Sequence, residues 1–170
     1  MYFFTSDEHY GHSNIIKYCN RPFSNVYEMN KTLVENHNKK VKDKDTTVHA
    51  GDFSLSSYEK VKEHILNLKG KHIFLKGSHD QWIKKYEKET GERVHEILEL
   101  NVTNTLHVVV CHYSMRVWPR SHFGSIQLFG HSHGKLNPLI NQYDIGVDSN
   151  NFEPLSISEI LRRINYEIVT

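Results

Sequence analysis

Short apolar segments alternate with helical patterns along this chain of 170 residues, and this alternation constrains the fold more than any other feature. In the first half, the predicted strands lie at 1–5, 46–52 and 71–77. The helical patterns between and after them lie at 25–41, 56–70 and 80–91. Strands that alternate with helices predict a layered α/β structure. We expect a single domain, because a chain of this length builds one core and leaves little room for a second.

The second half is richer in strands. Predicted strands follow one another at 94–100, 104–112, 125–131 and 143–148, before a last helix at 156–164. Consecutive strands without helices between them indicate a second sheet, or added antiparallel strands, packed against the first sheet. The sequence thus favours an α/β sandwich that extends over residues 1–170.

The ends of the predicted helices carry recognisable signals. Ser56, followed three residues later by Glu59, fits the start of a helix. Gly70 and Gly91 fit helix ends, because glycine tolerates the left-handed backbone that is common there. These signals support the helices expected at 56–70 and 80–91.

The charge balance argues against several classes of partner. Lysine and arginine number 21 against 20 aspartates and glutamates, which gives a net charge of +1. We therefore expect neither a stable nucleic-acid complex nor a membrane partner. No apolar run approaches the roughly 18 residues of a membrane span, and the N-terminus lacks the basic segment of a signal peptide. Cys19 and Cys111 form no CxxC pair, which favours a reduced, cytoplasmic location.

Five of the apolar segments end in the same kinds of residue. They read FFTSDEH, TVHAGD, IFLKGSHD, VVVCH and LFGHSHG. A single Asp after a strand is most often a turn or cap residue, but five coincident ends of one chemistry are harder to explain in that way. The carboxyl ends of strands in α/β sheets line the ligand crevice. We expect these ends to bring together Asp7, His9, Asp52, His79, Asp80, His112, His131 and His133.

The chain has 13 histidines, so their positions matter more than their number. Five lie in helical or strand patterns without a partner motif and are expected to be structural: His37, His64, His95, His107 and His122. His12 and His49 flank the motifs, and the sequence leaves their roles open.

The residue types at the strand ends indicate metal binding. Imidazole nitrogens and carboxylate oxygens without thiolates suit manganese, iron, zinc, cobalt or nickel better than a cysteine-rich structural zinc site. Asp7 and His9, like His131 and His133, are two positions apart, so each pair can point to one side of an extended or looping chain. These candidates are too many for one tetrahedral ion. Two ions about 3.5–4 Å apart that share a carboxylate would use them, in the arrangement that suits phosphoester displacement.

The ordered motifs resemble those of the calcineurin-like metallophosphoesterase superfamily, whose signature is D-x-H, G-D, G-N-H-D/E, H and G-H-x-H. Here they stand, in that order, at 7–9, 51–52, 77–80, 112 and 130–133. They span residues 5–134, and the surrounding sequence resembles the small bacterial and phage members that lack a cap. The resemblance implies a four-layer αββα sandwich, in which helices flank two mixed β-sheets.

The resemblance also implies roles for the motif residues. The first ion would be held by Asp7, His9 and His133. Asp52 would bridge to a second ion, whose other ligands would be Ser78, His112 and His131. His79 would protonate the leaving group, held in orientation by Asp80, and a hydroxide shared by the two ions would be the nucleophile. Two divalent ions are expected, manganese first, with iron, zinc, nickel or cobalt as alternatives.

Ser78 departs from the pattern, because the family has asparagine at this position. The serine hydroxyl stands on a shorter stem than a carboxamide, so we expect a weakened second metal site and reduced turnover. Three explanations stay open: a natural variant whose second ion is completed by water, an introduced substitution that cripples the enzyme, or a step toward a non-catalytic scaffold. All the other ligands are present, which argues against the scaffold.

The sequence therefore predicts a dinuclear metal-dependent phosphoesterase that acts on phosphodiesters. The diester preference comes from the resemblance, since the same ligands serve monoesters. A phosphomonoesterase and a binding scaffold of the same fold are the alternatives. Arg116, four residues after His112, and Arg21 are candidates for holding phosphate oxygens in bidentate fashion. Nucleotides and cyclic nucleotides are candidate substrates, and a homodimer stays open.

Overall fold

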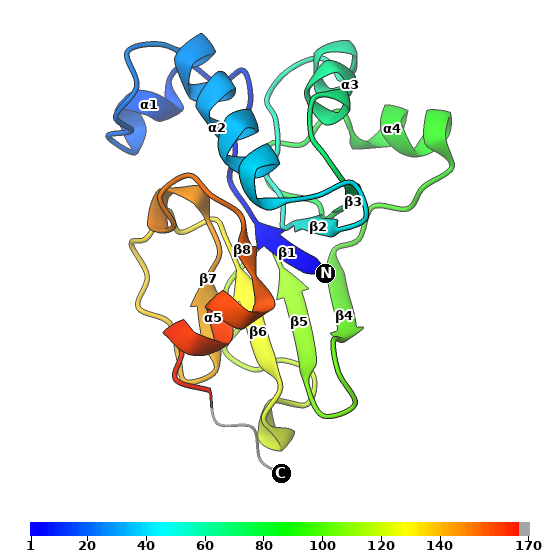
Figure 1. Cartoon of the computed structure of the whole chain (residues 1–170), viewed down its shortest axis with the longest axis vertical. Helices are drawn as coiled ribbons and strands as arrows, with labels where there is room; N and C mark the ends of the chain where they lie inside the picture. Colours follow the sequence, from blue (N-terminus) through cyan, green and yellow to red (C-terminus); the bar gives the residue numbers. More distant parts are fainter. Residues whose placement is uncertain (167–170) are drawn as a thin grey trace.

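A computed structural model describes residues 1–166 of the chain and shows two four-stranded sheets. The first sheet has the order β3-β2-β1-β8, with strands Lys71–Phe74, Thr46–His49, Tyr2–Thr5 and Leu155–Ser156. The second has the order β4-β5-β6-β7, with strands Ile97–Asn101, His107–Cys111, Ile126–Phe129 and Gln142–Asp144. Each sheet contains both parallel and antiparallel pairs. The predicted α/β sandwich of two mixed sheets is confirmed (Figure 1). Residues 167–170 of the predicted domain lie outside the described residues.

The helices agree with the sequence where their patterns are long. They are α1 (Ile15–Tyr18), α2 (Val26–Lys40), α3 (Tyr58–Leu66), α4 (Ile83–Thr90) and α5 (Ile157–Arg163), with the 3-10 turns η1 (Ser121–Phe123) and η2 (Val147–Ser149). The side chain of Asn25 caps α2 by accepting hydrogen bonds from two backbone N–H groups. Helix α3 begins after Ser57, one residue later than the predicted Ser56, and its C-cap is Asn67, so the predicted end at Gly70 is wrong. Gly91 ends α4 as predicted, with φ of 73°.

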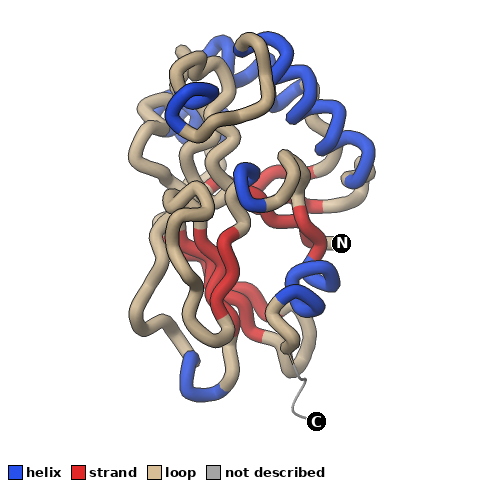
Figure 2. The backbone as a smooth tube through the Cα atoms, turned by 90° about the vertical axis from the view of Figure 1, so that its left-hand side faces the viewer, coloured by secondary structure: helices blue, strands red, loops and turns tan. Residues whose placement is uncertain are grey.

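Two apolar clusters hold the layers together. One lies between helices α2–α4 and the first sheet, and includes Met29, Leu33, Val61, Phe74 and Trp82. The other lies between the two sheets, where alternate residues of facing strands meet: Phe4, Val48, Val108, Val110, Ile126 and Leu128. Figure 2 shows the strands in two groups beneath the main helical layer. The sheets therefore share one core, which fixes their strand ends relative to each other.

The outer face of the second sheet is covered by an irregular segment, residues 113–125, whose only regular turn is η1. Gln127 on β6 donates to the carbonyl of Tyr113 at 3.2 Å, and Gln142 on β7 donates to that of Met115 at 2.5 Å. Trp118 is buried in the same segment. Helix α5 instead contacts β1 and β8 (Figure 1). The fourth layer is thus this irregular segment, which shows no helical periodicity. Hydrogen bonds from side chains of the sheet to its backbone carbonyls hold it in place.

The loops that follow the strands meet along one edge of the sandwich. The backbone N–H of Asp7 donates to Gly51 at 3.1 Å, and that of His9 donates to Asp52 at 3.0 Å. In the second sheet, Gly130 donates to the carbonyl of His112 at 3.0 Å, and Ser6 forms a bridge to Gly146 that joins the two sheets. The motif segments are therefore tied to one another by backbone hydrogen bonds. Among residues 1–166, no helix combines the length and apolar character that a membrane crossing requires.

Three histidines lie together between α2 and the first sheet, with His37 and His49 buried and His72 partly buried, and they predict a sensitivity to acid. Burial lowers the pKa of His37 to about 4, and those of His49 and His72 to about 3. In the unfolded chain these groups take up protons below their ordinary pKa of 6.5, whereas in the folded protein they take up protons only at lower pH. Stability that is present above pH 6.5 is therefore lost as the pH falls toward the folded-state pKa values.

The test uses His37→Phe, which removes one of these titrating groups. Urea unfolding with a chelator present, at pH 7.5 and pH 4.5, should show that the wild type loses about 2 kcal/mol more free energy of unfolding than the variant over this interval. The variant also lacks the bond from His37 to the Lys69 carbonyl (2.9 Å), which lowers its free energy of unfolding at both pH values. This constant difference cancels when the pH-dependent losses of the two proteins are compared. Equal losses would contradict the prediction.

Candidate metal centre

Asp52 is the central residue of the candidate site. It follows β2, is 2% exposed, and places its Oδ2 atom 3.7 Å from His9 Nε2 and 3.5 Å from His112 Nε2. Its Oδ1 atom accepts the backbone N–H of His79 at 2.8 Å. One carboxylate thus lies between imidazoles from two different sheets, which is the position that a bridging ligand requires.

Two groups of potential ligands surround this carboxylate. The first consists of Asp7, His9 and His133, and the second of Asp52, His112 and His131. Within each group, one candidate ligand atom per residue lies within 4.8 Å of the others. The six residues come from the loops after β1, β2, β5 and β6. Six of the seven metal ligands that the sequence suggested fall into these two groups, and the seventh, Ser78, places its hydroxyl 3.0 Å from Asp52 Oδ2.

The backbone of the ligands is unusual. Asp7, His9, Asp52, His131 and His133 all have positive φ, between 47° and 66°. This left-handed conformation costs about 1–2 kcal/mol for a residue with a side chain, and it persists only where the surroundings enforce it. The carboxylate of Asp7 helps to do so by accepting the N–H of His131 at 2.9 Å.

Gly77 also explains why the loops can approach so closely. A Cβ atom at this position would lie 2.1 Å from the backbone nitrogen of Asp52 and 2.2 Å from its Oδ1 atom. Any side chain would displace the central carboxylate. Glycine here is thus required by the contact itself rather than by the turn.

Three of the four ligand histidines have their Nδ1 atom occupied. His112 Nδ1 lies 2.9 Å from the carbonyl of Ala50, His133 Nδ1 lies 2.7 Å from Asp148 Oδ2, and His9 Nδ1 lies 3.5 Å from His12 Nδ1. These partners leave Nε2 to face the centre, as in histidine ligands of metals. His12, whose role the sequence left open, lies beside a ligand and contributes to this set.

The Nε2 atoms of His9 and His112 are buried and have no hydrogen-bond partner in the described part of the chain. Buried polar atoms nearly always have a partner. The two nitrogens approach the same carboxylate oxygen of Asp52 with no hydrogen bond to it. A cation bound between these atoms would satisfy all three. The residues present therefore fit divalent metal ions.

The charges of the site point the same way. Burial raises the pKa of Asp7 to about 7 and lowers that of His9 to about 3. Burial also opposes ionisation of Asp52, but the nearby imidazoles of His112 and His9 and the backbone N–H of His79 outweigh burial and hold its pKa well below the usual range. Without an added positive charge, the ligand carboxylates and imidazoles compete for protons. Bound cations would remove this competition.

Arg21 does not face a substrate, so the prediction that it holds phosphate is wrong. Its guanidinium is buried and binds Asp148 through two hydrogen bonds of 2.8 Å. It also donates to the carbonyls of Asp7 at 2.7 Å and Glu8 at 3.0 Å. Every contact that a phosphate would need is already taken, and Arg21 instead fixes the Asp7 loop and the partner of His133.

Asp148 is a residue of the site that was not predicted from the sequence. It accepts from Arg21 and His133, and these bonds outweigh the effect of burial and lower its pKa. A usable signal existed, because Asp148 ends the segment YDIGVD just as the other acids end their strands. Asp148 and His133 also lie near Cys19, but their oxygen and nitrogen atoms are already bonded, so this grouping adds no further metal site.

The loop at 77–80 differs from the prediction in one respect. Asp80 accepts the backbone N–H groups of Asp52 at 2.7 Å and Gly77 at 2.9 Å, and the indole N–H of Trp82 at 2.9 Å. It makes no bond to the His79 ring within residues 1–166, so the predicted orienting role is wrong. Buried directly after a strand, its oxygens satisfy backbone donors. Asp80 therefore shapes the loop that carries His79.

His79 and Ser78 line the open side of the centre. The His79 side chain is 49% exposed, and its Nε2 atom lies 4.0 Å from Asp52 Oδ2. The Ser78 hydroxyl donates to the same oxygen at 3.0 Å. Arg116 lies exposed in the segment after His112 and has no ion-pair partner in the described chain, so its contact with phosphate stays a prediction.

Comparison with known proteins adds a family and a fold. No protein-family model matches the chain. It is 34% identical to the uncharacterized protein MJ1445 of Methanocaldococcus jannaschii, over 94% of this chain and 88% of that protein. The chain belongs to the MJ1445 family. The name MJ1445 states no activity, so family membership adds no reaction to the geometry described above.

A solved structure resembles this member of the MJ1445 family. The crystal structure of the protein of unknown function AQ665 from Aquifex aeolicus matches it with a TM-score of 0.76 and 22% sequence identity. The match covers 96% of this chain and 98% of the other. At this identity the likeness shows the fold alone. The resemblance to the calcineurin-like superfamily stays a prediction.

Proposed function

We propose that this protein is a phosphodiesterase that works with two divalent metal ions. The observation that carries the proposal is the position of Asp52 Oδ2, 3.5–3.7 Å from two buried Nε2 atoms that have no other partner in residues 1–166. The resemblance of the ordered motifs to the metallophosphoesterases supports it independently. Both cysteines are unpaired, which supports a cytoplasmic location.

The two ligand groups would each hold one ion. Asp7, His9 and His133 would form one site and His112 and His131 the other, with Asp52 shared between them. Nitrogen and oxygen ligands without thiolate suit manganese first, and iron, zinc, nickel or cobalt as alternatives. When bound, such a pair of ions supplies a water of lowered pKa and offsets the charge that develops on the phosphoryl oxygens.

His79 is the chain's own candidate for proton transfer. It belongs to neither ligand group, its ring is half exposed, and its backbone N–H is fixed to Asp52. An imidazole at this position can reach both the substrate and the solvent. It would hold a proton at Nε2 and pass it to the departing alcohol oxygen.

The first test is hydrolysis after metal removal and replacement. The protein is stripped with a chelator, loaded with manganese, and assayed on bis(p-nitrophenyl) phosphate, p-nitrophenyl phosphate and a panel of cyclic nucleotides. The proposal expects metal-dependent rates with diesters above monoesters. Faster monoester cleavage would make the protein a phosphatase. Two bound ions without hydrolysis of any ester would make it a binding scaffold.

Ser78→Asn is expected to strengthen the second metal site. The serine hydroxyl is engaged with Asp52 Oδ2 at 3.0 Å, whereas a carboxamide extends further and offers a carbonyl oxygen. We expect the affinity for the second ion and the diesterase rate to rise about 10-fold, a typical size for a residue that tunes a metal site. Calorimetric titration with manganese and the nitrophenyl assay measure both.

The matched control is Ser78→Ala, which removes the hydroxyl bond to Asp52 without supplying a ligand. It should not reproduce the gain. If Ser78→Asn leaves both occupancy and rate at the wild-type level, the serine is not the weak point of the site.

A further inference from the structure

The Glu8 side chain occupies a position that the proposed chemistry does not use. Glu8 lies between two ligands of the first group, Asp7 and His9, but its carboxyl group is buried against His49 and belongs to neither ligand group. Its Oε1 atom lies 2.5 Å from Nδ1 of His49, and its backbone carbonyl accepts from Arg21 at 3.0 Å. The residue between two candidate metal ligands is thus anchored on both its side chain and its backbone.

His49 is held rigidly at the end of β2. Its ring stacks on Phe74 with a centroid distance of 4.9 Å and packs edge-on against Phe53 at 5.0 Å. Its Nε2 atom lies 3.1 Å from Nδ1 of His72 on β3. The side chains of Glu8, His49 and His72 therefore form a continuous hydrogen-bonded row across the face of the first sheet. The row begins at the first ligand group and ends at the edge strand.

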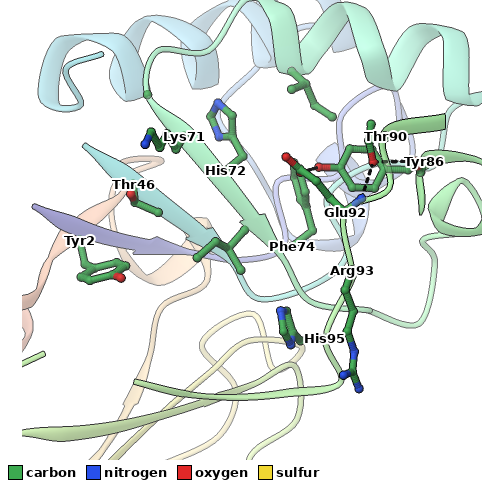
Figure 3. A pocket seen from close by; sticks show the side chains of 13 residues that line it. Tyr2, Thr46, Lys71, His72, Phe74, Tyr86, Thr90, Glu92, Arg93 and His95 are labelled. Carbon is green, nitrogen blue, oxygen red and sulfur yellow. Dashed lines mark hydrogen bonds between the residues drawn. The ribbon is translucent and has the colours of Figure 1, made fainter. Parts of the chain in front are cut away.

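The far end of the row is less enclosed than its middle. Figure 3 shows His72 on β3 with its side chain directed toward the helical layer. His72 also lines a pocket of about 860 Å³ along the outer edge of β3. His49, in contrast, is 1% exposed. A substitution of His49, which contacts Glu8 directly, would therefore affect Glu8 more than a substitution of His72.

Glu8 has little else to hold it in this position. Its Oε2 atom is buried without a hydrogen-bond partner in residues 1–166. The cavity beside it, lined by Tyr10 and His37 among others, measures about 10 Å³, which is room for about one water molecule. His49 is therefore the one side chain that binds the carboxyl group of Glu8 in the described structure. A buried carboxyl group that loses this partner would be expected to move.

Movement of Glu8 would reach the ligands on either side of it. Asp7 and His9 both have left-handed backbone conformations, with φ of 60° and 54°. Such conformations persist only where neighbouring contacts enforce them. The second ligand group has separate anchors, because Ala50 binds His112 and Asp80 binds the backbone of Asp52.

We propose that His49 is a positioning residue of the metal centre, which holds Glu8 and thereby sets Asp7 and His9 for the first ion. His72 supports His49 from behind. This inference rests on the proposed function, since it requires that the centre bind two ions. It predicts that loss of the His49 contact weakens one ion selectively.

The test is a calorimetric titration of the chelator-treated protein with manganese. His49→Phe keeps an aromatic ring between Phe53 and Phe74 but cannot bind Glu8. We expect it to weaken one of the two sites 10- to 100-fold, the usual loss when a residue that orients a ligand is removed, and to change the other less than about 3-fold. His49→Asn, whose amide lies near the position of Nδ1, should restore most of the affinity.

His37→Phe is the matched control. His37 stacks on His49 in the same buried cluster, but its own bond goes to the carbonyl of Lys69. It should leave both ions unaffected. If it weakens manganese as much as His49→Phe does, the cluster acts only as core packing and the inference is overturned.

Two further outcomes are decisive. If His49→Phe does not fold, Glu8→Met takes its place, because it removes the same contact from the other side and should give the same selective loss. Unchanged binding of both ions in the folded variant overturns the inference alone. A wild-type protein that binds fewer than two ions overturns the proposed function, and this inference with it.

Discussion

Asp52→Asn is expected to abolish the binding of both metal ions. The Oδ2 atom of Asp52 lies 3.7 Å from His9 Nε2 in the first ligand group and 3.5 Å from His112 Nε2 in the second. Asparagine keeps the size of the side chain but removes the charge that the two ions would share. A shared carboxylate contributes several kcal/mol of charge stabilisation, so we expect diesterase activity to fall by at least about 1000-fold.

Calorimetry and elemental analysis would measure the ions directly. Asp45→Asn is a suitable control, because this carboxylate also holds a cation, the N-terminal ammonium group at 2.9 Å, but takes no part in the centre. It should retain both ions. If Asp52→Asn loses only one ion, the carboxylate does not bridge, and the centre is better described as two independent sites.

The strongest elements of the fold were predictable because their patterns are local. The helical pattern at 25–41 corresponds to α2, Val26–Lys40, whose cap and apolar stripe are encoded within the helix itself. Helix α4 begins later than expected, at Ile83, because Asp80 and Trp82 are engaged in the loop at the metal centre. Tertiary contacts there override the local helical signal.

The elements that were missed are short and depend on distant partners. Strand β8 has two residues, Leu155–Ser156, and is defined by antiparallel pairing with Phe4 and Phe3 of β1. Helix α1 has four residues and one buried side chain, Ile15. Neither segment is long enough to show a hydrophobic periodicity, so both elements depend on contacts that form only in the folded chain.

The same distinction between local and long-range signals holds for the candidate site. The six residues of the two ligand groups were identifiable because each stands where an apolar segment ends. The partners of these ligands were not, because they depend on contacts far apart in sequence. Arg21 meets Asp148 across 127 positions, and no pattern near either residue indicates that pairing. Sequence predicted which side chains converge but not which of them are already satisfied.

His79→Ala is expected to reduce turnover about 100- to 10,000-fold, the range for loss of a positioned proton donor. Both ions should stay bound, since His79 lies outside the two ligand groups and its backbone N–H, which binds Asp52, is kept. His12→Ala is the matched control. The His12 ring lies 6.3 Å from that of His79 on the same open side, but His12 bonds to the ligand His9.

The leaving group provides the sharper test of this role. A nitrophenolate departs without much help from an acid, whereas an alkoxide such as a ribose oxygen needs a proton as the bond to phosphorus breaks. His79→Ala should therefore slow the cleavage of a dinucleotide far more than that of bis(p-nitrophenyl) phosphate, with manganese binding unchanged in both assays. If the two substrates lose rate equally, His79 contributes to binding or to charge. If His12→Ala instead gives the unequal losses, the proton comes from His12, and the exposed ring of His79 has another use.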